Sequence, residues 1–281
     1  MKVLITGAKG QLGKAFQELF EKENVNCLLT DKKLLDITNF KLTRKFIEEK
    51  NKDITHIINC AAYNDVDKAE KDWKQAFNVN GLGVRNLALC ANNIEAELVH
   101  YSTDYVFSGE KFKYNISDTP NPVNKYGESK VLGENFLSVA KKSYLIRVSW
   151  VFGDGEQNFP IKLINWSKKN NQLKIITDEV SSPTYTIDLA EATLELIKLK
   201  AQGKYHITNS SCSRYNWAKY ILNKIGWKGE LLKAKQADFK TEAKRPKSSI
   251  LDNFGYFETT GNQLRDWKEV TNDFLRKKGI I

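Results

Sequence analysis

A tyrosine and a lysine stand four residues apart, at Tyr126 and Lys130, where a turn-rich segment meets a run of apolar residues at helical spacing. On an α-helix these two positions share one face, so the phenol and the amine would point the same way. A phenol has an ordinary pKa of about 10, and a nearby ammonium group lowers that pKa by favouring the phenolate. The pair therefore predicts a general acid or base tuned toward neutral pH. Solvated helix faces carry the same spacing by chance, so the prediction depends on the rest of the chain.

Three glycines at Gly7, Gly10 and Gly13 follow a short apolar run, residues 3–5, and precede an amphipathic run. This order predicts a buried strand, a tight turn and a helix. Gly7 would make the turn, and Gly10 would let backbone amides approach a pyrophosphate at the helix N-terminus. Gly13 would let the helix pack closely on the sheet. A tight turn without a ligand is the alternative, but the flanking strand and helix favour a dinucleotide site.

An acidic residue, Asp31, ends the second predicted strand, residues 26–30. It lies about 20 residues after the glycine turn, where a carboxylate suits the ribose 2′-hydroxyl of NAD and repels the 2′-phosphate of NADP. Lys32 and Lys33 follow directly and would weaken that repulsion. The sequence thus favours NADH and leaves NADPH open, with a plain turn residue as the alternative reading of Asp31.

Two further predicted strands, residues 56–62 and 97–101, end in residues that suit a ligand site. The first runs into Ala61 and Ala62, whose small side chains would let either a flat cofactor or a helix lie close to the sheet. The second leads into Ser102, Thr103 and Asp104, all able to hydrogen-bond at the strand edge where open α/β sheets bind ligands. The hydroxyls can donate to a substrate carbonyl oxygen, and ordinary turn chemistry is the alternative.

Strand and helix patterns alternate five or six times before residue 150, which is typical of a doubly wound parallel α/β sheet. We expect residues 1–150 to form a dinucleotide-binding Rossmann domain, which a helix near 186–199 would complete. Residues 151–281 are less regular and should form mainly a smaller α/β substrate-binding lobe. Helices are also expected over residues 40–50, 84–91, 126–141, 215–225 and 262–278, and strands over 144–148, 173–176 and 203–207.

Composition and charge exclude several classes of protein. The 281 residues are 41% hydrophobic and 28% charged, as in soluble globular proteins, and we expect neither a membrane span nor a signal peptide. The net charge of +10 comes from dispersed lysines, which argues against nucleic acid and favours small anions. Because the four cysteines are scattered and there are only three histidines, we expect neither disulfides nor a metal site. The same cysteine pattern predicts a cytoplasmic location. His100 and His206 are expected to be structural.

Taken together, these blocks resemble the extended short-chain dehydrogenase/reductase superfamily, and within it the dTDP-4-dehydrorhamnose reductase family. The resemblance runs through nearly the whole chain. The segments that carry it are residues 10–13, 35–38, 61–63, 66–70, 102–109, 126–130, 149–153, 158–159, 182–184 and 245–246.

The resemblance implies NAD(P)H-dependent reduction of a 4-keto sugar on thymidine diphosphate, giving dTDP-L-rhamnose for surface polysaccharide. It implies a catalytic trio in which Tyr126 donates a proton, Lys130 lowers the Tyr126 pKa and bonds the nicotinamide ribose, and Thr103 orients the carbonyl. The implied cofactor contacts are Gly7, Gly10, Gln11, Leu12, Gly13, Asp31, Asp36, Ile37, Ala61, Ala62, Tyr63, Tyr126 and Lys130. The implied substrate contacts are Thr103, Asp104, Trp150 and Arg245.

The sequence departs from this family at two places. Some members have a glutamate two residues after the third glycine that helps to hold Mg²⁺ between subunits, and Ala15 stands there in this chain. We therefore expect no metal, and a homodimer stays open. Asn64 and Asp65 replace smaller or hydroxylated residues, which leaves the substrate details open. Two alternatives remain: a nicotinamide-binding regulatory subunit of a methionine adenosyltransferase, against which the intact trio argues, and a reductase or epimerase of another nucleotide sugar.

Overall fold

The computed structural model describes residues 1–281, and its central feature is a six-stranded parallel sheet. The strand order is β11-β6-β4-β3-β1-β2, so the chain starts one strand in from an edge and reverses its direction across the sheet between β1 and β3. This is a doubly wound sheet whose ligands collect at the carboxyl edge near the point of reversal, as the sequence predicted. The strands are β1 (Lys2–Thr6), β2 (Asn26–Leu29), β3 (His56–Asn59), β4 (Glu97–Thr103), β6 (Ser143–Val148) and β11 (Gly203–His206).

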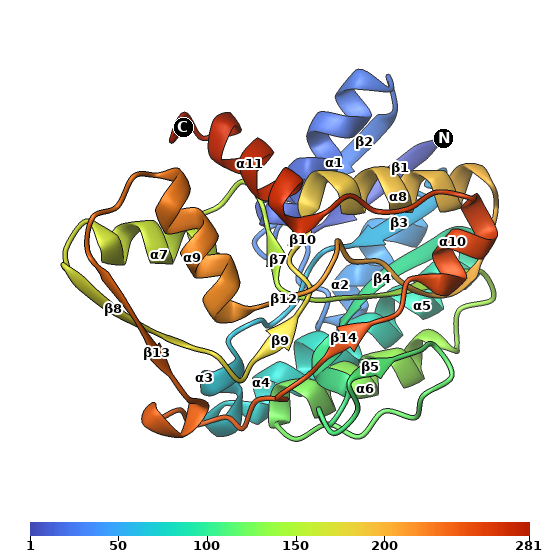
Figure 1. Cartoon of the computed structure of the whole chain (residues 1–281). Helices are drawn as coiled ribbons and strands as arrows, with labels where there is room; N and C mark the ends of the chain where they lie inside the picture. The colour runs from blue at the N-terminus through green and yellow to red at the C-terminus, as the bar shows by residue number, and fades with distance from the viewer.

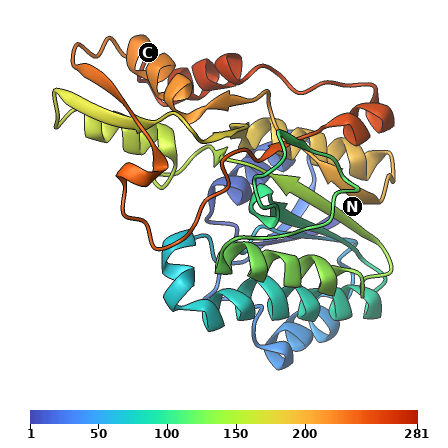
Figure 2. The same ribbon diagram turned by 60° about the horizontal axis from the view of Figure 1, so that its bottom comes forward.

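Helices cover both faces of the sheet (Figure 1). On one face, α1 and α8 pack together over a core that contains Phe16, Phe20 and Leu189. On the other face, α5 and α6 lie side by side beneath the sheet (Figure 2). Because both faces are covered, β3 and β4 are almost wholly buried. The helices are α1 (Gln11–Lys22), α2 (Phe40–Arg44), α5 (Gly83–Asn93), α6 (Lys125–Leu137) and α8 (Thr186–Lys198).

The glycine turn between β1 and α1 depends on the absence of side chains. Gly7 has φ +63°, and a Cβ there would lie 2.7 Å from the Ala61 backbone nitrogen. A Cβ at Gly13 would lie 2.7 Å from the Gly7 carbonyl oxygen. The predicted strand, turn and closely packed helix are therefore confirmed.

A second, smaller lobe lies at the left of Figure 1. Its core contains Trp217 and Phe274, and its two long strands pair in parallel. Its elements are α7 (Phe159–Ser167), β8 (Gln172–Ile176), α9 (Arg214–Lys224), β13 (Glu230–Ala234) and α11 (Trp267–Lys277). Short pairs of strands join the lobes: β7 (Val151–Phe152) with β10 (Thr184–Tyr185), β9 (Val180–Ser181) with β12 (Cys212–Ser213), and β5 (Lys113–Tyr114) with β14 (Ile250–Leu251). The remaining helices are α3 (Val66–Lys71), α4 (Trp73–Phe77) and α10 (Phe254–Thr260).

Several elements differ from the sequence predictions. Strand β11 belongs to the large sheet, although it follows residue 150 and was assigned to the smaller lobe. The helix expected over residues 40–50 divides into α2 and a π-helical segment, Lys45–Glu49. The last helix begins at Trp267 because Asp266 caps it, accepting from the Lys268 amide. The strand at 230–234 was not predicted, since its alternation of polar and apolar residues is irregular. No helix is long and apolar enough to cross a membrane.

Candidate functional site

A cavity of about 670 Å³ opens at the carboxyl edge of β1, β2 and β3. It lies beside the reversal of strand order, where doubly wound folds bind nucleotides. Lys9, Lys32 and Lys68 line it together with Asp31, Asp36 and Asp72, so cationic and anionic groups are balanced around the cavity. The cavity brings together many of the predicted cofactor contacts: Gly7, Gly10, Asp31, Asp36, Ile37, Ala61, Ala62 and Tyr63.

Two predicted cofactor contacts have other partners. The Gln11 side-chain oxygen accepts from the Gly153 amide at 3.0 Å and from Asn158 Nδ2 at 2.8 Å, so it ties the glycine turn to the second lobe. Leu12 is half-buried against the core under α1. The Gln11 side chain thus bonds the second lobe, and the Leu12 side chain packs on the core. A residue in the first turn of a helix can direct its side chain to the side of the helix as well as toward a ligand at its end.

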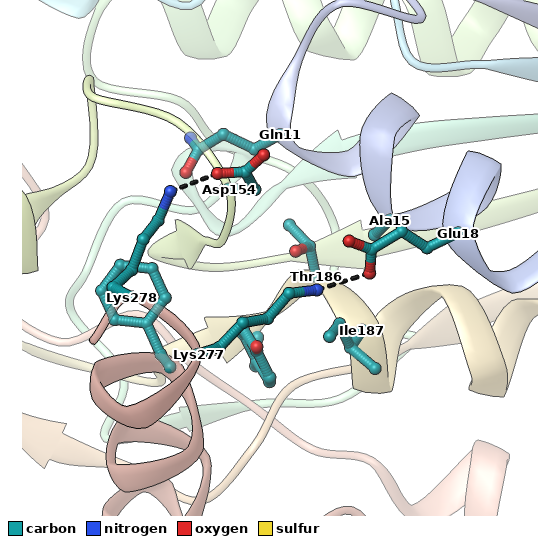
Figure 3. A pocket seen from close by; sticks show the side chains of 10 residues that line it. Gln11, Ala15, Glu18, Asp154, Thr186, Ile187, Lys277 and Lys278 are labelled. Atoms are coloured by element: carbon teal, nitrogen blue, oxygen red, sulfur yellow. Dashed lines mark hydrogen bonds and ion pairs between the residues drawn. The ribbon is translucent and has the colours of Figure 1, made fainter. Parts of the chain in front are cut away.

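Gln11 also lines a smaller cavity of about 150 Å³ between α1 and α11 (Figure 3). Its charges are paired with one another: Lys277 bonds Glu18 at 2.5 Å, and Lys278 bonds Asp154. This cavity therefore joins the C-terminal helix to α1 through ion pairs that are complete without a ligand.

Three consecutive residues at the end of β4 contact three successive turns of α6. The Tyr101 carbonyl oxygen accepts from Lys130 Nζ at 2.5 Å. Ser102 Oγ donates to Glu134 Oε1 at 2.6 Å. The Thr103 hydroxyl hydrogen-bonds the Tyr126 phenol. The strand end thus sets the register of the helix, and the predicted trio of Thr103, Tyr126 and Lys130 comes together.

The start of α6 explains how the helix comes so close to the strand edge. Asn124 caps it, its Oδ1 accepting from the Gly127 amide at 2.7 Å. A Cβ at Gly127 would lie 2.3 Å from the Tyr105 carbonyl oxygen, and one at Gly133 would lie 2.1 Å from the Asn80 carbonyl oxygen. Only glycine fits at these contacts, so local sequence sets the distance between α6 and the sheet.

The pKa of the Tyr126 phenol moves in the direction opposite to the one expected. Burial raises it to about 12, the bond with Thr103 opposes the rise, and the Asp104 carboxylate adds to it. The Lys130 ammonium, which was expected to lower this pKa, is directed at the Tyr101 carbonyl oxygen instead. Burial is the largest influence, so the net shift of the pKa is upward, opposite to the predicted lowering, and the phenol stays protonated at neutral pH.

The Lys130 amine is itself strongly perturbed. Lys130 is only 3% exposed. Burial lowers the pKa of its amine to about 8, and the Glu134 carboxylate opposes that fall. An amine with this pKa changes charge close to neutral pH, which is uncommon for lysine and typical of functional sites.

Asp104, predicted to touch substrate, lies behind Thr103 instead. It is 2% exposed, and its carboxylate accepts from four hydroxyls: Thr103 at 3.0 Å, Ser149 at 2.9 Å, Ser181 at 3.1 Å and Ser249 at 2.5 Å. Burial raises its pKa, and these hydrogen bonds oppose the rise. Thr103 thus has two polar neighbours: the Asp104 carboxylate, to which its hydroxyl donates, and the Tyr126 phenol, whose pKa it lowers.

A second cavity of about 410 Å³ lies between the second lobe and Tyr105. The predicted Arg245 lines it, and its guanidinium also bonds Asp67 at 2.6 Å. The predicted Trp150, with φ +41°, lies under the Arg214 guanidinium, 3.4 Å from its ring centre. Phe159 also lines this cavity and belongs to a segment that carries the family resemblance, but it was not predicted as a contact. Sequence reasoning missed other lining residues because no motif marks them; they include Lys162, Trp166, Lys174 and Arg214.

Helix α6 is fixed to a wall of each cavity. The Tyr126 ring meets the Tyr105 ring edge-on, with centres 6.0 Å apart. On the other side, Asn80 bonds both the amide and the carbonyl of Tyr63, at 2.8 and 2.9 Å, and donates to Ser129 Oγ at 2.9 Å. Helix α6 is thus linked to a residue that lines each cavity, although Tyr126 and Lys130 themselves line neither.

Comparisons with known proteins agree with this geometry. The model of the RmlD substrate binding domain family matches residues 1–279. The chain is 34% identical to the spore coat polysaccharide biosynthesis protein SpsK of Bacillus subtilis (strain 168), over 99% of this chain and 98% of that protein. It is 35% identical to the dTDP-4-dehydrorhamnose reductase of Aggregatibacter actinomycetemcomitans, over 96% of each. A crystal structure of the Bacillus anthracis str. Ames dTDP-4-dehydrorhamnose reductase in complex with NADP superposes with a TM-score of 0.94, at 37% identity, covering 98% of this chain and 99% of that one.

Proposed function

The chain belongs to the RmlD substrate binding domain family, and from this membership we propose that it reduces the 4-keto group of dTDP-4-dehydro-L-rhamnose to give dTDP-L-rhamnose. NADH or NADPH is the hydride donor, and the product serves surface polysaccharide synthesis in the cytoplasm. The observation that carries the proposal is the register of Tyr126 and Lys130 on the end of β4, on a helix that is linked to a wall of each cavity. This arrangement supports a role for Tyr126 as a buried general acid beside the nicotinamide ring.

The residues around the 670 Å³ cavity fit a dinucleotide. No side chain caps the N-terminus of α1, so the first-turn amides are free for a pyrophosphate. Gly7 and Gly10 allow close approach of the backbone, Ala61 and Ala62 keep one wall flat, and Asp31 suits a ribose hydroxyl. When bound, the cofactor supplies a hydride. The chain's own residues hold it and exclude water from the reacting carbon.

The 410 Å³ cavity fits the nucleoside diphosphate of the substrate. Arg214, Arg245 and the two lysines of its lining can pair with the phosphates. Phe159 and Trp166 give apolar surface for the base. The sugar would then lie toward Tyr105 and hence toward Tyr126.

Tyr126 acts as the general acid. Its raised pKa keeps the proton on the phenol until an alkoxide, a much stronger base, develops beside it. Thr103 holds the phenol in place, and the Lys130 ammonium offsets the negative charge that remains after transfer. General acid catalysis of this kind contributes about 10²–10⁴-fold, and fixed positioning supplies much of the rest.

A panel of nucleotide 4-keto sugars with NADH and NADPH, followed at the nicotinamide absorbance, tests the proposal. We expect dTDP-4-dehydro-L-rhamnose to be reduced with the highest kcat/KM. Faster reduction of a sugar on another nucleotide would assign a different reductase. Cofactor binding with no oxidation by any sugar would favour the regulatory alternative.

Cofactor choice depends on Lys9. Lys9 is ion-paired with Asp31, whose carboxylate also accepts from the Lys33 and Leu34 amides at 3.0 and 3.1 Å. The Lys9 hydrogen bond is the main cause of the lowered Asp31 pKa. We propose that NADH is preferred and that Lys9 neutralises Asp31 enough to admit the 2′-phosphate of NADPH.

Lys9→Ala should therefore raise the KM for NADPH by about threefold to fivefold and leave the KM for NADH within about twofold. The reason is that an unpaired Asp31 repels the phosphate but still accepts from a ribose hydroxyl. Steady-state kinetics with both cofactors measure the ratio. Lys14→Ala, which removes a lysine paired with Asp154 instead, is the control. Equal effects on both cofactors in Lys9→Ala would contradict the assignment.

A further inference from the structure

Glu134 is a buried carboxylate that the reaction as described does not use. It lies one helical turn after Lys130 on α6, and its side chain is 7% exposed. Arg147, on β6 and fully buried, donates to it from Nε at 2.9 Å and from Nη2 at 2.7 Å. Ser102 donates to the same carboxylate at 2.6 Å. Three donors from two strands therefore fix its position.

The position of Glu134 bears directly on the catalytic pair. Ser102 stands between Tyr101, which accepts from Lys130, and Thr103, which bonds Tyr126. If Glu134 moved, α6 could rotate or slide against β4, and both Lys130 and Tyr126 would lose their register.

We propose that Glu134 is a positioning residue of the reductase site: held by Arg147 and Ser102, its carboxylate keeps α6 in register with β4 and keeps the Lys130 amine protonated. This inference rests on the proposed function. Glu134 would be a third functional residue on α6, one helical turn after Lys130, in addition to Tyr126 and Lys130.

The charges near Lys130 favour this role. Glu134 is the charged neighbour that offsets the burial of the amine. His100, on β4, also faces Lys130, and burial together with that ammonium holds its pKa well below the ordinary value, so it is neutral. Arg147 directs its charge at Glu134, and Asp104 faces Tyr126. Loss of Glu134 therefore leaves the buried ammonium without a compensating charge.

Stability alone does not require an ion pair here. Buried ion pairs are often replaceable by apolar residues of similar volume with little loss or even a gain in stability. If the Glu134–Arg147 pair also sets the charge of the Lys130 amine, it has a function apart from stability. The effect on stability and the effect on the amine can be measured separately.

The test follows the Lys130 amine directly. Protein with ¹³C-labelled lysine is titrated by NMR, with the Lys130 signal identified by its loss in Lys130→Arg. The wild-type amine should titrate near pH 8. In Glu134→Gln it should titrate about one pH unit lower. Because that variant leaves Arg147 unpaired and could fold poorly, Glu134→Gln/Arg147→Met serves as the second variant, with a smaller lowering expected because the Arg147 cation is lost as well.

The matched control is Glu128→Gln, which removes an exposed carboxylate of the same helix that pairs with Lys125. It should leave the Lys130 titration unchanged. Titration of the amine in Glu134→Gln at the wild-type pH would overturn the proposal, and so would a higher titration pH in that variant. NADH affinity measured against pH gives a second readout, and its alkaline loss should move with the NMR titration. Neither readout uses a sugar, so a failed sugar assay would refute the proposed function without touching this inference.

Discussion

Replacing Tyr126 with phenylalanine lowers kcat by about 10²–10⁴-fold and leaves the Kd for NADH within about twofold. The phenol oxygen is the group that gives a proton to the developing alkoxide, and phenylalanine keeps the ring against Tyr105 while removing that proton. Because burial holds the phenol pKa near 12, ionised tyrosine plays no part in wild-type binding at neutral pH. Stopped-flow turnover and NADH fluorescence titration measure the two quantities.

The control is Tyr220→Phe, which removes a hydroxyl that donates to Asn272 in the second lobe, away from both cavities. Its kcat should stay within about twofold of wild type. A Tyr126→Phe enzyme that keeps a tenth or more of wild-type kcat would assign the proton to another donor, and solvent would be the next group to test.

The sequence predicted those parts of the site that follow from backbone geometry. The glycine turn is one case: Gly7 and Gly13 have no room for a Cβ, and the strand and helix on either side are short and regular. Helical spacing likewise predicted that Tyr126 and Lys130 share a face, and both do contact the end of β4. These features depend on residues close together in the chain.

What the sequence could not predict depends on contacts between distant segments. Asp104 follows the catalytic threonine, as a substrate contact would, yet hydroxyls from residues 149, 181 and 249 surround it. Trp150 was expected near substrate, and Arg214, more than sixty positions later, covers its ring. The direction of the Tyr126 pKa failed for the same reason: the partner of Lys130 proved to be a backbone carbonyl that no side-chain pattern reveals.

These distant contacts give the site a common design. The acidic side chains Asp104 and Glu134 both lie behind the catalytic residues, where each holds one of them: Asp104 orients the Thr103 hydroxyl, and Glu134 lies beside Lys130. Neither carboxylate faces a ligand cavity. The negative charge of these two side chains therefore acts on the protein's own hydroxyl and ammonium groups.

Lys130→Met is expected to lower both cofactor affinity and turnover, and this separates it from Tyr126→Phe. A hydrogen bond from a charged donor is worth about 1.5–3 kcal/mol, so loss of the bond to the nicotinamide ribose should raise the Kd for NADH by roughly 10–150-fold. Turnover should fall by about 10²-fold or more, because the phenolate left after proton transfer loses its neighbouring ammonium. Lys125→Met removes an exposed lysine of the same helix and should change neither value.

The stability of Lys130→Met should move differently from its activity. In the wild-type protein the amine pKa is about 8, below its ordinary 10.5, so the unfolded chain binds the proton more tightly. The buried ammonium therefore costs folding free energy below pH 8, and this cost is relieved as the pH rises from 8 to 10.5. Methionine removes the cost and leaves the Tyr101 carbonyl without its donor, so Tm at pH 7 should hold or rise, and the wild-type gain in stability above pH 8 should disappear. If Lys130→Met lost both activity and stability, Lys130 would instead be a structural residue. A lysine that is retained for catalysis should be replaceable without loss of stability.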